Sequence, residues 1–214
     1  MILVGMFDSP FVRRVAVSMR LLGIPFEHRN WSVGRDFDSI RRFNPVGRVP
    51  TLVLDDGEAL MESAAILDYL DEQVGPDRAL IPRSGAPRRS TLRILAMLTG
   101  AAEKGIAQVY EGIFRPPAKR HEPWLARCRN QMHGSLEELE RIGATRGPGR
   151  WLAADRMTQA DVTLACVFGF LAEAPGLDAV TAPYSALRAV AARCEAMPVF
   201  SSTRAAYVVP AADG

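Results

Sequence analysis

Short apolar runs and helix-spaced apolar positions alternate in the first third of the chain. Met1–Met6 is an apolar run without a helical period, which predicts a strand buried on both faces. Ser9 is a favourable N-cap and Pro10 suits the first helical position, so we expect a helix to begin there. Gly23 and Pro25 end that helix. Its apolar stripe consists of Phe11, Val12, Val15, Ala16, Met19 and Leu22.

The pattern next predicts a second strand and helix, and then a hairpin followed by a helix. The expected elements are a strand over 26–31, a short helix over 36–43, strands over 51–54 and 59–61, and a helix from Glu62-Ser63 to Val74. Asp55-Asp56-Gly57-Glu58 is a hairpin signal between the last two strands. A helical connection implies parallel strands and a tight hairpin implies antiparallel ones. The order βαβ-ββα therefore predicts a four-stranded mixed sheet covered by helices.

A change of composition to Pro, Gly, Arg and Ser predicts an interdomain linker over residues 77–86. Beyond it no segment has a convincing strand pattern. Helices are expected over 87–112, 124–142, 158–171 and 184–197. The sequence thus predicts an α/β domain over 1–76 and an all-α domain, a bundle of helices, over 87–214.

Thr158-Gln159-Ala160-Asp161 has the spacing of a capping box. The segment from Val162 to Leu171 is apolar nearly all round, so we expect a central, buried helix whose first turn is satisfied internally by Thr158 and Asp161. The alternative is an ordinary surface cap worth about 1 kcal/mol.

Composition narrows the class of protein. Among 214 residues, 23% are charged and 48% hydrophobic, which is typical of a soluble globular protein, and a net charge of +2 is too small to imply nucleic acid. The N-terminal apolar run is too short for a signal peptide or a membrane span. Three distant cysteines without Cys-x-x-Cys spacing support neither a disulfide framework nor zinc, and three histidines lack ligand spacing. We expect no metal and a reducing cytoplasm.

The loop Asn44–Pro50 carries the most informative local chemistry. Pro50 stands at the first residue of a strand, where it removes no hydrogen-bond donor from the strand interior. A cis bond before it would leave the N–H and C=O of Val49 pointing outward, available to an extended peptide ligand. The alternative is an ordinary trans turn, which is the commoner form of a prolyl bond.

Four motifs in this order resemble those of the cytosolic glutathione transferases, over essentially the whole chain. Ser9-Pro10-Phe11-Val12-Arg13-Arg14-Val15 is similar to the active-site turn of their serine-type bacterial members. The other three are the loop and strand from Asn44 to Leu52, similar to their cis-proline loop, Glu62-Ser63-Ala64-Ala65-Ile66-Leu67, similar to their glutathione-carboxylate motif, and the capping box Thr158–Asp161. The resemblance implies a thioredoxin-like first domain that holds glutathione and a helical domain that supplies the electrophile pocket.

The resemblance also assigns roles to particular residues. It implies that Ser9 is catalytic and stabilises the glutathione thiolate. The γ-glutamyl carboxylate would be received by Ser63 and the N–H groups of that helix start, and the γ-glutamyl ammonium by Glu62. Arg35 and Arg48 are alternative partners for the glycyl carboxylate. The glutathione-binding residues expected in all are Phe11, Arg35, Arg48, Val49, Pro50, Glu62 and Ser63.

The electrophile pocket is expected to be hydrophobic. By position, Met6, Phe7, Tyr110, Phe114 and Arg115 are its candidate residues, and Phe11 could also face it. For each of these positions packing in the core is the alternative role. The sequence does not name the physiological electrophile.

Three functions are compatible with the sequence. The first is a glutathione transferase, which is expected to be a homodimer with the helix after Ser63 and the long helix from Pro87 as candidate surfaces. The second is a non-catalytic relative that binds a protein partner. The third is a glutathione-dependent peroxidase, dehalogenase or isomerase on the same fold. A thiol–disulfide exchanger is disfavoured because the Ser9 hydroxyl cannot form a mixed disulfide.

Overall fold

The structure is a computed structural model that describes residues 1–177 and 179–209. The chain divides into two compact units. One consists of Met1–Arg83 and the described residues from Pro198 onward, and the other of Ser84–Met197. The boundary between Arg83 and Ser84 lies inside the predicted linker, but the segment after Met197 belongs to the first unit and not, as predicted, to the helical domain.

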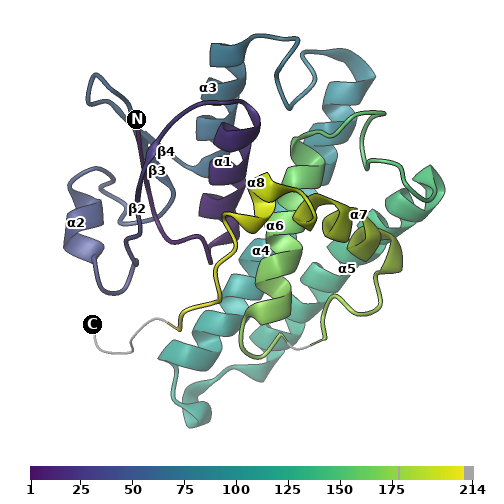
Figure 1. Cartoon of the computed structure of the whole chain (residues 1–214). Coiled ribbons are helices and arrows are strands. Elements are labelled where there is room, and N and C mark those ends of the chain that lie inside the picture. The colour runs from purple at the N-terminus through teal and green to yellow at the C-terminus, as the bar shows by residue number, and fades with distance from the viewer. Residues whose placement is uncertain (178, 210–214) are drawn as a thin grey trace. The chain divides into compact units, whose positions relative to one another are not determined.

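The first unit is built on a four-stranded mixed sheet (Figure 1). The strands are β1 (Ile2–Val4), β2 (Glu27–Arg29), β3 (Thr51–Val53) and β4 (Ala59–Met61), in the order β2-β1-β3-β4. β1 is parallel to β2 and antiparallel to β3, which is antiparallel to β4, so the predicted mixed sheet is confirmed. β1, β2 and β3 are shorter than predicted, and β4 has the predicted bounds. β1 ends at Val4 because Gly5 has a φ of +129°, outside the extended region.

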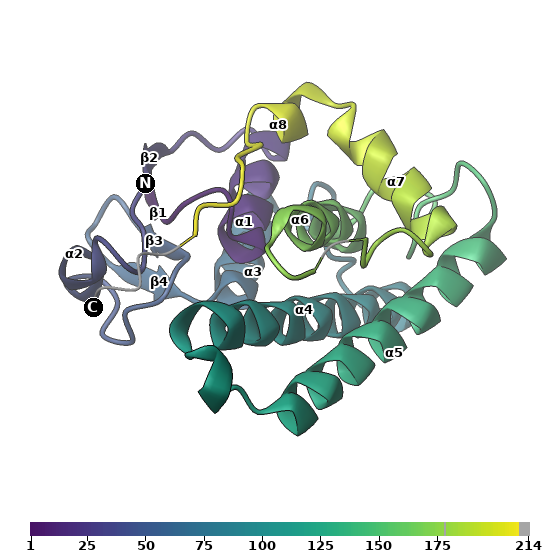
Figure 2. The same ribbon diagram turned by 90° about the horizontal axis from the view of Figure 1, so that it is seen from below.

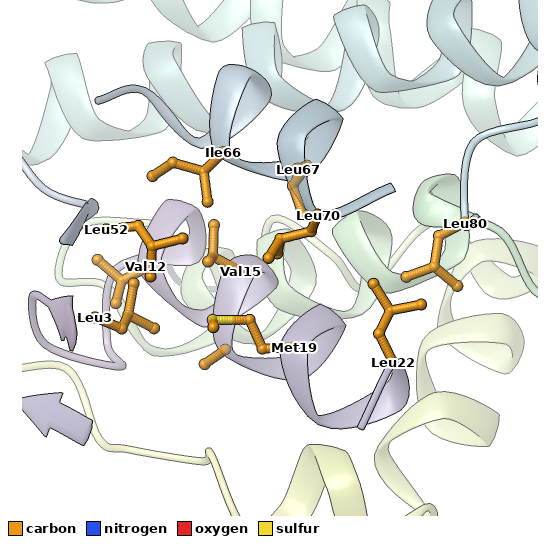
Figure 3. Packing of buried hydrophobic residues seen from close by; sticks show 11 residues of the cluster. Leu3, Val12, Val15, Met19, Leu22, Leu52, Ile66, Leu67, Leu70 and Leu80 are labelled. Atoms are coloured by element: carbon orange, nitrogen blue, oxygen red, sulfur yellow. The ribbon is translucent and has the colours of Figure 1, made fainter. Parts of the chain in front are cut away.

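Three helices of this unit lie where the sequence places them. They are α1 (Pro10–Leu21), α2 (Phe37–Arg41) and α3 (Ser63–Val74). α1 and α3 pack against each other, and their apolar side chains meet those of β1 and β3 in one core (Figure 3). The core comprises Leu3, Val12, Val15, Ala16, Met19, Leu22, Leu52, Ile66, Leu67, Leu70 and Leu80.

The C-terminal segment joins the first unit through buried contacts. α8 (Pro198–Ser201) contacts α1, and Phe200 is fully buried. The guanidinium of Arg13 donates from Nη2 to the Phe200 carbonyl at 3.1 Å and from Nε to Thr203 Oγ1 at 3.4 Å. These partners lie far apart in sequence, so a local pattern contains no sign of the contact. For that reason the predicted domain 87–214 is too long at its C-terminal end.

The regular elements of the second unit, within its described residues, are all helices. Its elements are α4 (Gly85–Phe114), the 3-10 helix η1 (Pro117–Lys119), α5 (Glu122–Arg146), α6 (Gln159–Glu173) and α7 (Ser185–Glu195). α4 lies beside α5 and also contacts α6, and α7 contacts both α5 and α6 (Figure 2). From Gln159 to Leu171 all residues of α6 but Gly169 are buried, which confirms the predicted central helix. No helix in the described part of the chain is both long and apolar enough to cross a membrane.

Candidate functional site

Ser9 caps the first helix of the sheet-bearing unit. It has extended backbone angles, and its Oγ accepts a hydrogen bond from the Val12 N–H at 3.4 Å, with Pro10 at the first helical position. A serine hydroxyl can accept two hydrogen bonds and donate one. The cap uses an acceptor site, so the Ser9 proton stays able to donate to a ligand. Capping and stabilisation of a thiolate are therefore compatible roles for one hydroxyl.

The loop before β3 is held from inside by the buried side chain of Asn44. Its Nδ2 donates to the Arg48 carbonyl at 2.9 Å and to Thr51 Oγ1 at 3.2 Å, and its Oδ1 accepts from the Val46 N–H at 3.0 Å. All three hydrogen bonds of this side chain are directed at the loop, which fixes the backbone on both sides of Val49. Sequence analysis identified the loop but gave Asn44 no role.

The Val49–Pro50 peptide bond is cis. Val49 is half-buried, and its main-chain N–H and C=O make no hydrogen bond to another residue within 1–177 and 179–209. A donor and an acceptor on adjacent exposed backbone are what an extended peptide needs to pair with a chain edge. Pairing of a peptide ligand with this loop stays a prediction.

Gly5 brings that loop next to the start of α1. A Cβ at Gly5 would lie 2.5 Å from Val12 Cγ2 and 2.8 Å from Val49 Cβ, closer than real side chains approach. The glycine is therefore required by close packing as well as by its φ of +129°. The side chains of Val49 and of Val12, on the helix capped by Ser9, both pack against Gly5 at this point.

The N-terminus of α3 presents Ser63 and a buried arginine behind it. Ser63 Oγ accepts from Arg14 Nε at 3.1 Å and from Arg14 Nη2 at 2.7 Å. Arg14 is 3% exposed and Ser63 is 2% exposed. Sequence analysis placed Arg14 in the active-site turn without a role. One sequence feature could have indicated its role, namely a charged residue next to the apolar stripe of α1. Arginine is seldom buried without a partner.

Glu62 stands directly before α3 in an unusual conformation. Its φ of 65° lies in the left-handed region that non-glycine residues seldom adopt. Its Oε1 forms an ion pair with Arg48 Nη1 at 3.3 Å, and both side chains are more than half exposed. Arg35 instead pairs with its neighbour Asp36 at 3.2 Å. Of the two candidate arginines, Arg48 is the one in contact with the Glu62-Ser63 motif.

The predicted electrophile-pocket residues are divided between the two units. In the first unit, Phe7 stacks on His28 with ring centroids 3.8 Å apart. Tyr110 and Phe114, in the helical unit, are exposed and meet edge to face at 5.2 Å. The remaining candidates are Met6, which is half-buried, Phe11, whose ring lies 5.8 Å from the Arg14 guanidinium, and Arg115, which pairs with Glu111 at 2.9 Å. Because these residues belong to separate units, the pocket stays a prediction.

Asp8, beside Ser9, was not singled out from the sequence. Burial raises the pKa of its carboxyl, while hydrogen bonds to backbone N–H groups, including that of Val208 at 3.1 Å, act in the opposite direction. The contact with Val208 brings the C-terminal segment to the residue that precedes the cap of α1.

The capping box at the start of α6 has a structural role. Asp161 Oδ2 accepts from the Thr158 N–H at 2.8 Å and from Thr158 Oγ1 at 3.0 Å, and Oδ1 accepts from the Leu152 N–H at 2.9 Å. Both residues of the box are fully buried. The helix start is thus satisfied inside the protein and not at its surface. Residues 1–177 and 179–209 contain no group of His, Cys, Asp or Glu side chains that could hold a metal ion.

Comparison with known proteins identifies two matching family domains. The glutathione S-transferase N-terminal domain matches residues 3–78, and the glutathione S-transferase C-terminal domain matches residues 122–193. The protein YibF of Escherichia coli K12, described as an uncharacterized GST-like protein, is 33% identical over 172 residues, which cover 79% of this chain and 81% of YibF.

The fold is also similar to solved structures of glutathione transferases. A glutathione S-transferase of Methylobacterium radiotolerans, in complex with glutathione sulfonate, has a TM-score of 0.88 at 28% identity and covers 97% of this chain and 95% of its own. A glutathione transferase family member of Pseudomonas fluorescens with bound glutathione has a TM-score of 0.83 at 29% identity, covering 97% and 99%. Sequence motifs, fold and both domain matches agree, and the chain belongs to the glutathione S-transferase family.

Proposed function

We propose that this protein is a serine-type glutathione transferase, which binds glutathione on its first unit and directs the thiolate at a hydrophobic electrophile. The observation that carries the proposal is a set of contacts within that unit. Val49 packs at Gly5 beside the helix capped by Ser9, Arg48 reaches Glu62, and Glu62 precedes Ser63. Groups suited to different parts of one extended tripeptide are thereby connected. Solved relatives that hold glutathione or its sulfonate support this assignment.

Each part of glutathione has a chemically matched group. The cysteinyl amide pairs with the main-chain N–H and C=O of Val49, which has no main-chain partner within the described residues. The γ-glutamyl carboxylate lies at the N-terminus of α3, where Ser63 and the helix dipole favour an anion. Glu62 receives the γ-glutamyl ammonium. Arg48, which belongs to the same loop as Val49, is our choice over Arg35 for the glycyl carboxylate.

Ser9 would contribute by stabilising the thiolate. A thiol with a pKa near 8.5 is only about 3% ionised at pH 7, and lowering that pKa by ~2 units requires ~2.7 kcal/mol. One hydrogen bond to a charged sulfur, at about 1.5–3 kcal/mol, and the N-terminus of α1, at roughly 0.3–1 kcal/mol, can supply this amount. A less basic thiolate is also a weaker nucleophile, with a Brønsted slope of ~0.4–0.5. Activation of the thiol alone therefore raises the reaction rate only a few-fold. Alignment of the two substrates must supply most of the acceleration.

The test combines binding, thiolate titration and conjugation. Calorimetry should detect reduced glutathione binding to the purified protein, and the thiolate absorbance of the bound ligand should titrate below pH 8. In Ser9→Ala the bound thiol should titrate about 1–2 units higher, with a moderate loss of turnover. An unmoved titration would leave Ser9 as a helix cap only. A protein that binds glutathione but conjugates no electrophile would instead be a non-catalytic binding module.

The chemical class of electrophile is best found by comparison of substrates. We propose a hydrophobic acceptor, since Met6, Phe7, Phe11, Tyr110 and Phe114 are the candidate lining residues, with Arg115 neutralised by its pair with Glu111. A panel of halogenated, epoxide, isothiocyanate and peroxide compounds separates simple conjugation from dehalogenase and peroxidase activity on the same fold. Truncation of Phe114 to Ala should raise KM for the best electrophile and leave KM for glutathione unchanged.

We further propose a cytoplasmic homodimer. The cysteines Cys128, Cys166 and Cys194 are all buried free thiols, which suits a reducing compartment. Apolar Leu92 on α4 is 41% exposed, so this helix offers the kind of surface that a second copy of the chain would cover. Sedimentation equilibrium of the purified protein tests the dimer directly.

A further inference from the structure

The hydroxyl of Ser63 has an unusually restricted hydrogen-bonding capacity. A serine oxygen has two acceptor sites and one proton to donate. Both donors of the Arg14 fork, Nε at 3.1 Å and Nη2 at 2.7 Å, end on this one oxygen. With its acceptor sites filled, the hydroxyl can only donate. Within residues 1–177 and 179–209 its proton has no acceptor, so a ligand oxygen is the partner that it lacks.

Charge at this point favours an anionic oxygen over a neutral one. The guanidinium of Arg14 is 3% exposed and lies directly behind Ser63, where the structure holds it in place. The residue preceding α3, Glu62, makes no side-chain cap hydrogen bond, which leaves the first N–H groups of this twelve-residue helix free to donate. A hydroxyl that can only donate and free N–H groups at a helix start both favour an anionic oxygen.

We propose that Arg14 is a positioning residue for the carboxylate subsite: it turns Ser63 into an obligatory donor and makes the subsite selective for a carboxylate over a neutral carboxamide. This inference rests on the proposed binding of glutathione. Arg14 acts through Ser63, without contact to the reacting sulfur. Its contribution therefore falls on binding of the γ-glutamyl end of the ligand.

The test compares two ligands that differ only at that end. One is glutathione, and the other is its analogue in which the γ-glutamyl α-carboxylate is a carboxamide. Calorimetry on the wild-type protein should give at least tenfold tighter binding of glutathione, since hydrogen bonds to charged groups are the stronger ones. In Arg14→Gln that preference should fall to within about threefold, through loss of glutathione affinity. KM for glutathione should rise while kcat at saturation stays within about twofold.

Arg13 provides the matched control. It is also a buried arginine of α1, but its hydrogen bonds go to Phe200 and Thr203. Arg13→Gln should lower stability and keep the full preference for the carboxylate. Ser63→Ala should lose the preference in the same way as Arg14→Gln, and the double variant should lose little more, because the two residues act as a unit.

Several outcomes would overturn the inference while the proposed function stands. In one such outcome, Arg14→Gln keeps the wild-type preference for glutathione over the carboxamide analogue. In another, Arg14→Gln lowers the affinity for both ligands by the same factor, as expected if Arg14 has a purely structural role. If Arg14→Gln does not fold, Arg14→Lys decides. It keeps the charge but lacks the two-pronged donor, so it should retain only part of the preference, and an unchanged ratio would contradict us. Wild-type protein that binds neither ligand would refute the proposed function itself.

Discussion

Glu62 combines an expected ligand contact with a strained backbone. Its φ of 65° is outside the regions that residues with a Cβ prefer, and such conformations cost of order 1–3 kcal/mol. Strain of this kind persists where the surroundings impose it, and here the surroundings are the start of α3 and the pair with Arg48. The strain points to a side chain kept in place for function.

Two substitutions at this residue separate strain from binding. Glu62→Gly and Glu62→Ala both remove the carboxylate, so both should weaken glutathione binding about tenfold or more, as measured by calorimetry. Only glycine relieves the strained φ, and we expect Glu62→Gly to be more stable than Glu62→Ala by on the order of 1 kcal/mol in urea denaturation. The exposed pair with Arg48 is worth little, so Glu62→Ala itself should change stability slightly. Equal stability of the two variants would show that no strain is stored here.

The residue scale also shows what the sequence could reveal. Ser9 before Pro10, Val49 before Pro50 and Glu62 before Ser63 are neighbours in the chain, so their combination is visible as a motif. Arg14 and Ser63, by contrast, are 49 positions apart, and only the packing of α1 against α3 joins them. The loop support by Asn44 depended on where its amide points, which composition and spacing do not determine. Motifs were predictable, and the groups that hold them were not.

At the scale of elements, the start of α6 depends on one carboxylate. Asp161→Ala would leave the N–H groups of Leu152 and Thr158 and the Thr158 hydroxyl without their acceptor in a fully buried place. Each unsatisfied buried group costs about 1–3 kcal/mol, and three groups lose their acceptor, so we expect the free energy of unfolding of the helical unit to fall by roughly 3 kcal/mol or more. Thr158→Ala, which removes one of these groups together with its bond, should cost about 1 kcal/mol. Circular dichroism during urea denaturation measures both, and equal losses would contradict this account.

The same carboxylate should give stability a defined pH dependence. Burial raises the pKa of Asp161, although the hydrogen bonds from Leu152 and Thr158 oppose it. With the folded pKa above the unfolded one, the native state binds the proton more strongly. Stability contributed by this group is then fully present below about pH 4 and is lost as pH rises through the folded pKa.

Asp161→Asn isolates this contribution, because it removes the titrating group and leaves Asp8 in place. The stability difference, wild type minus variant, should fall as pH is raised from about 4 and become constant above the folded pKa. Urea denaturation at a series of pH values measures it. A difference that grows with pH would mean that the three hydrogen bonds outweigh burial.

Element boundaries were predictable where local chemistry fixes them. α1 begins at Pro10 after the Ser9 cap, and α6 follows Thr158, as expected. The first three strands were predicted too long, because apolar character continues past the residues that pair, while a glycine such as Gly5 ends the pairing. Similarly, a proline favours the first position of a helix, so Pro87 was predicted as the start of α4. The helix instead starts at Gly85. Pairing and packing set these ends, and local preference does not.

At the scale of the whole molecule, the first unit is discontinuous in sequence. Residues 1–83 gain a final piece from the other end of the chain, with Phe200 as its fully buried side chain and Arg13 as its hydrogen-bond partner. The composition change at 77–86 spans the division between Arg83 and Ser84. After Met197, where the chain joins the first unit again, the composition does not change. An amphipathic turn has the same sequence pattern whichever unit it packs on.

This arrangement predicts which unit responds to a change at residue 200. Phe200→Ala removes a fully buried ring, a change that costs about 3–5 kcal/mol in protein cores. Since local stability is set by the unit to which a residue contributes, hydrogen exchange should accelerate in α1 and the sheet, more than a hundred residues away in sequence, and change little in α5. Leu139→Ala, in the buried face of α5, is the control and should show the reverse distribution. Faster exchange confined to α6 and α7 in Phe200→Ala would assign the C-terminal segment to the helical unit and restore the boundary that the sequence alone suggested.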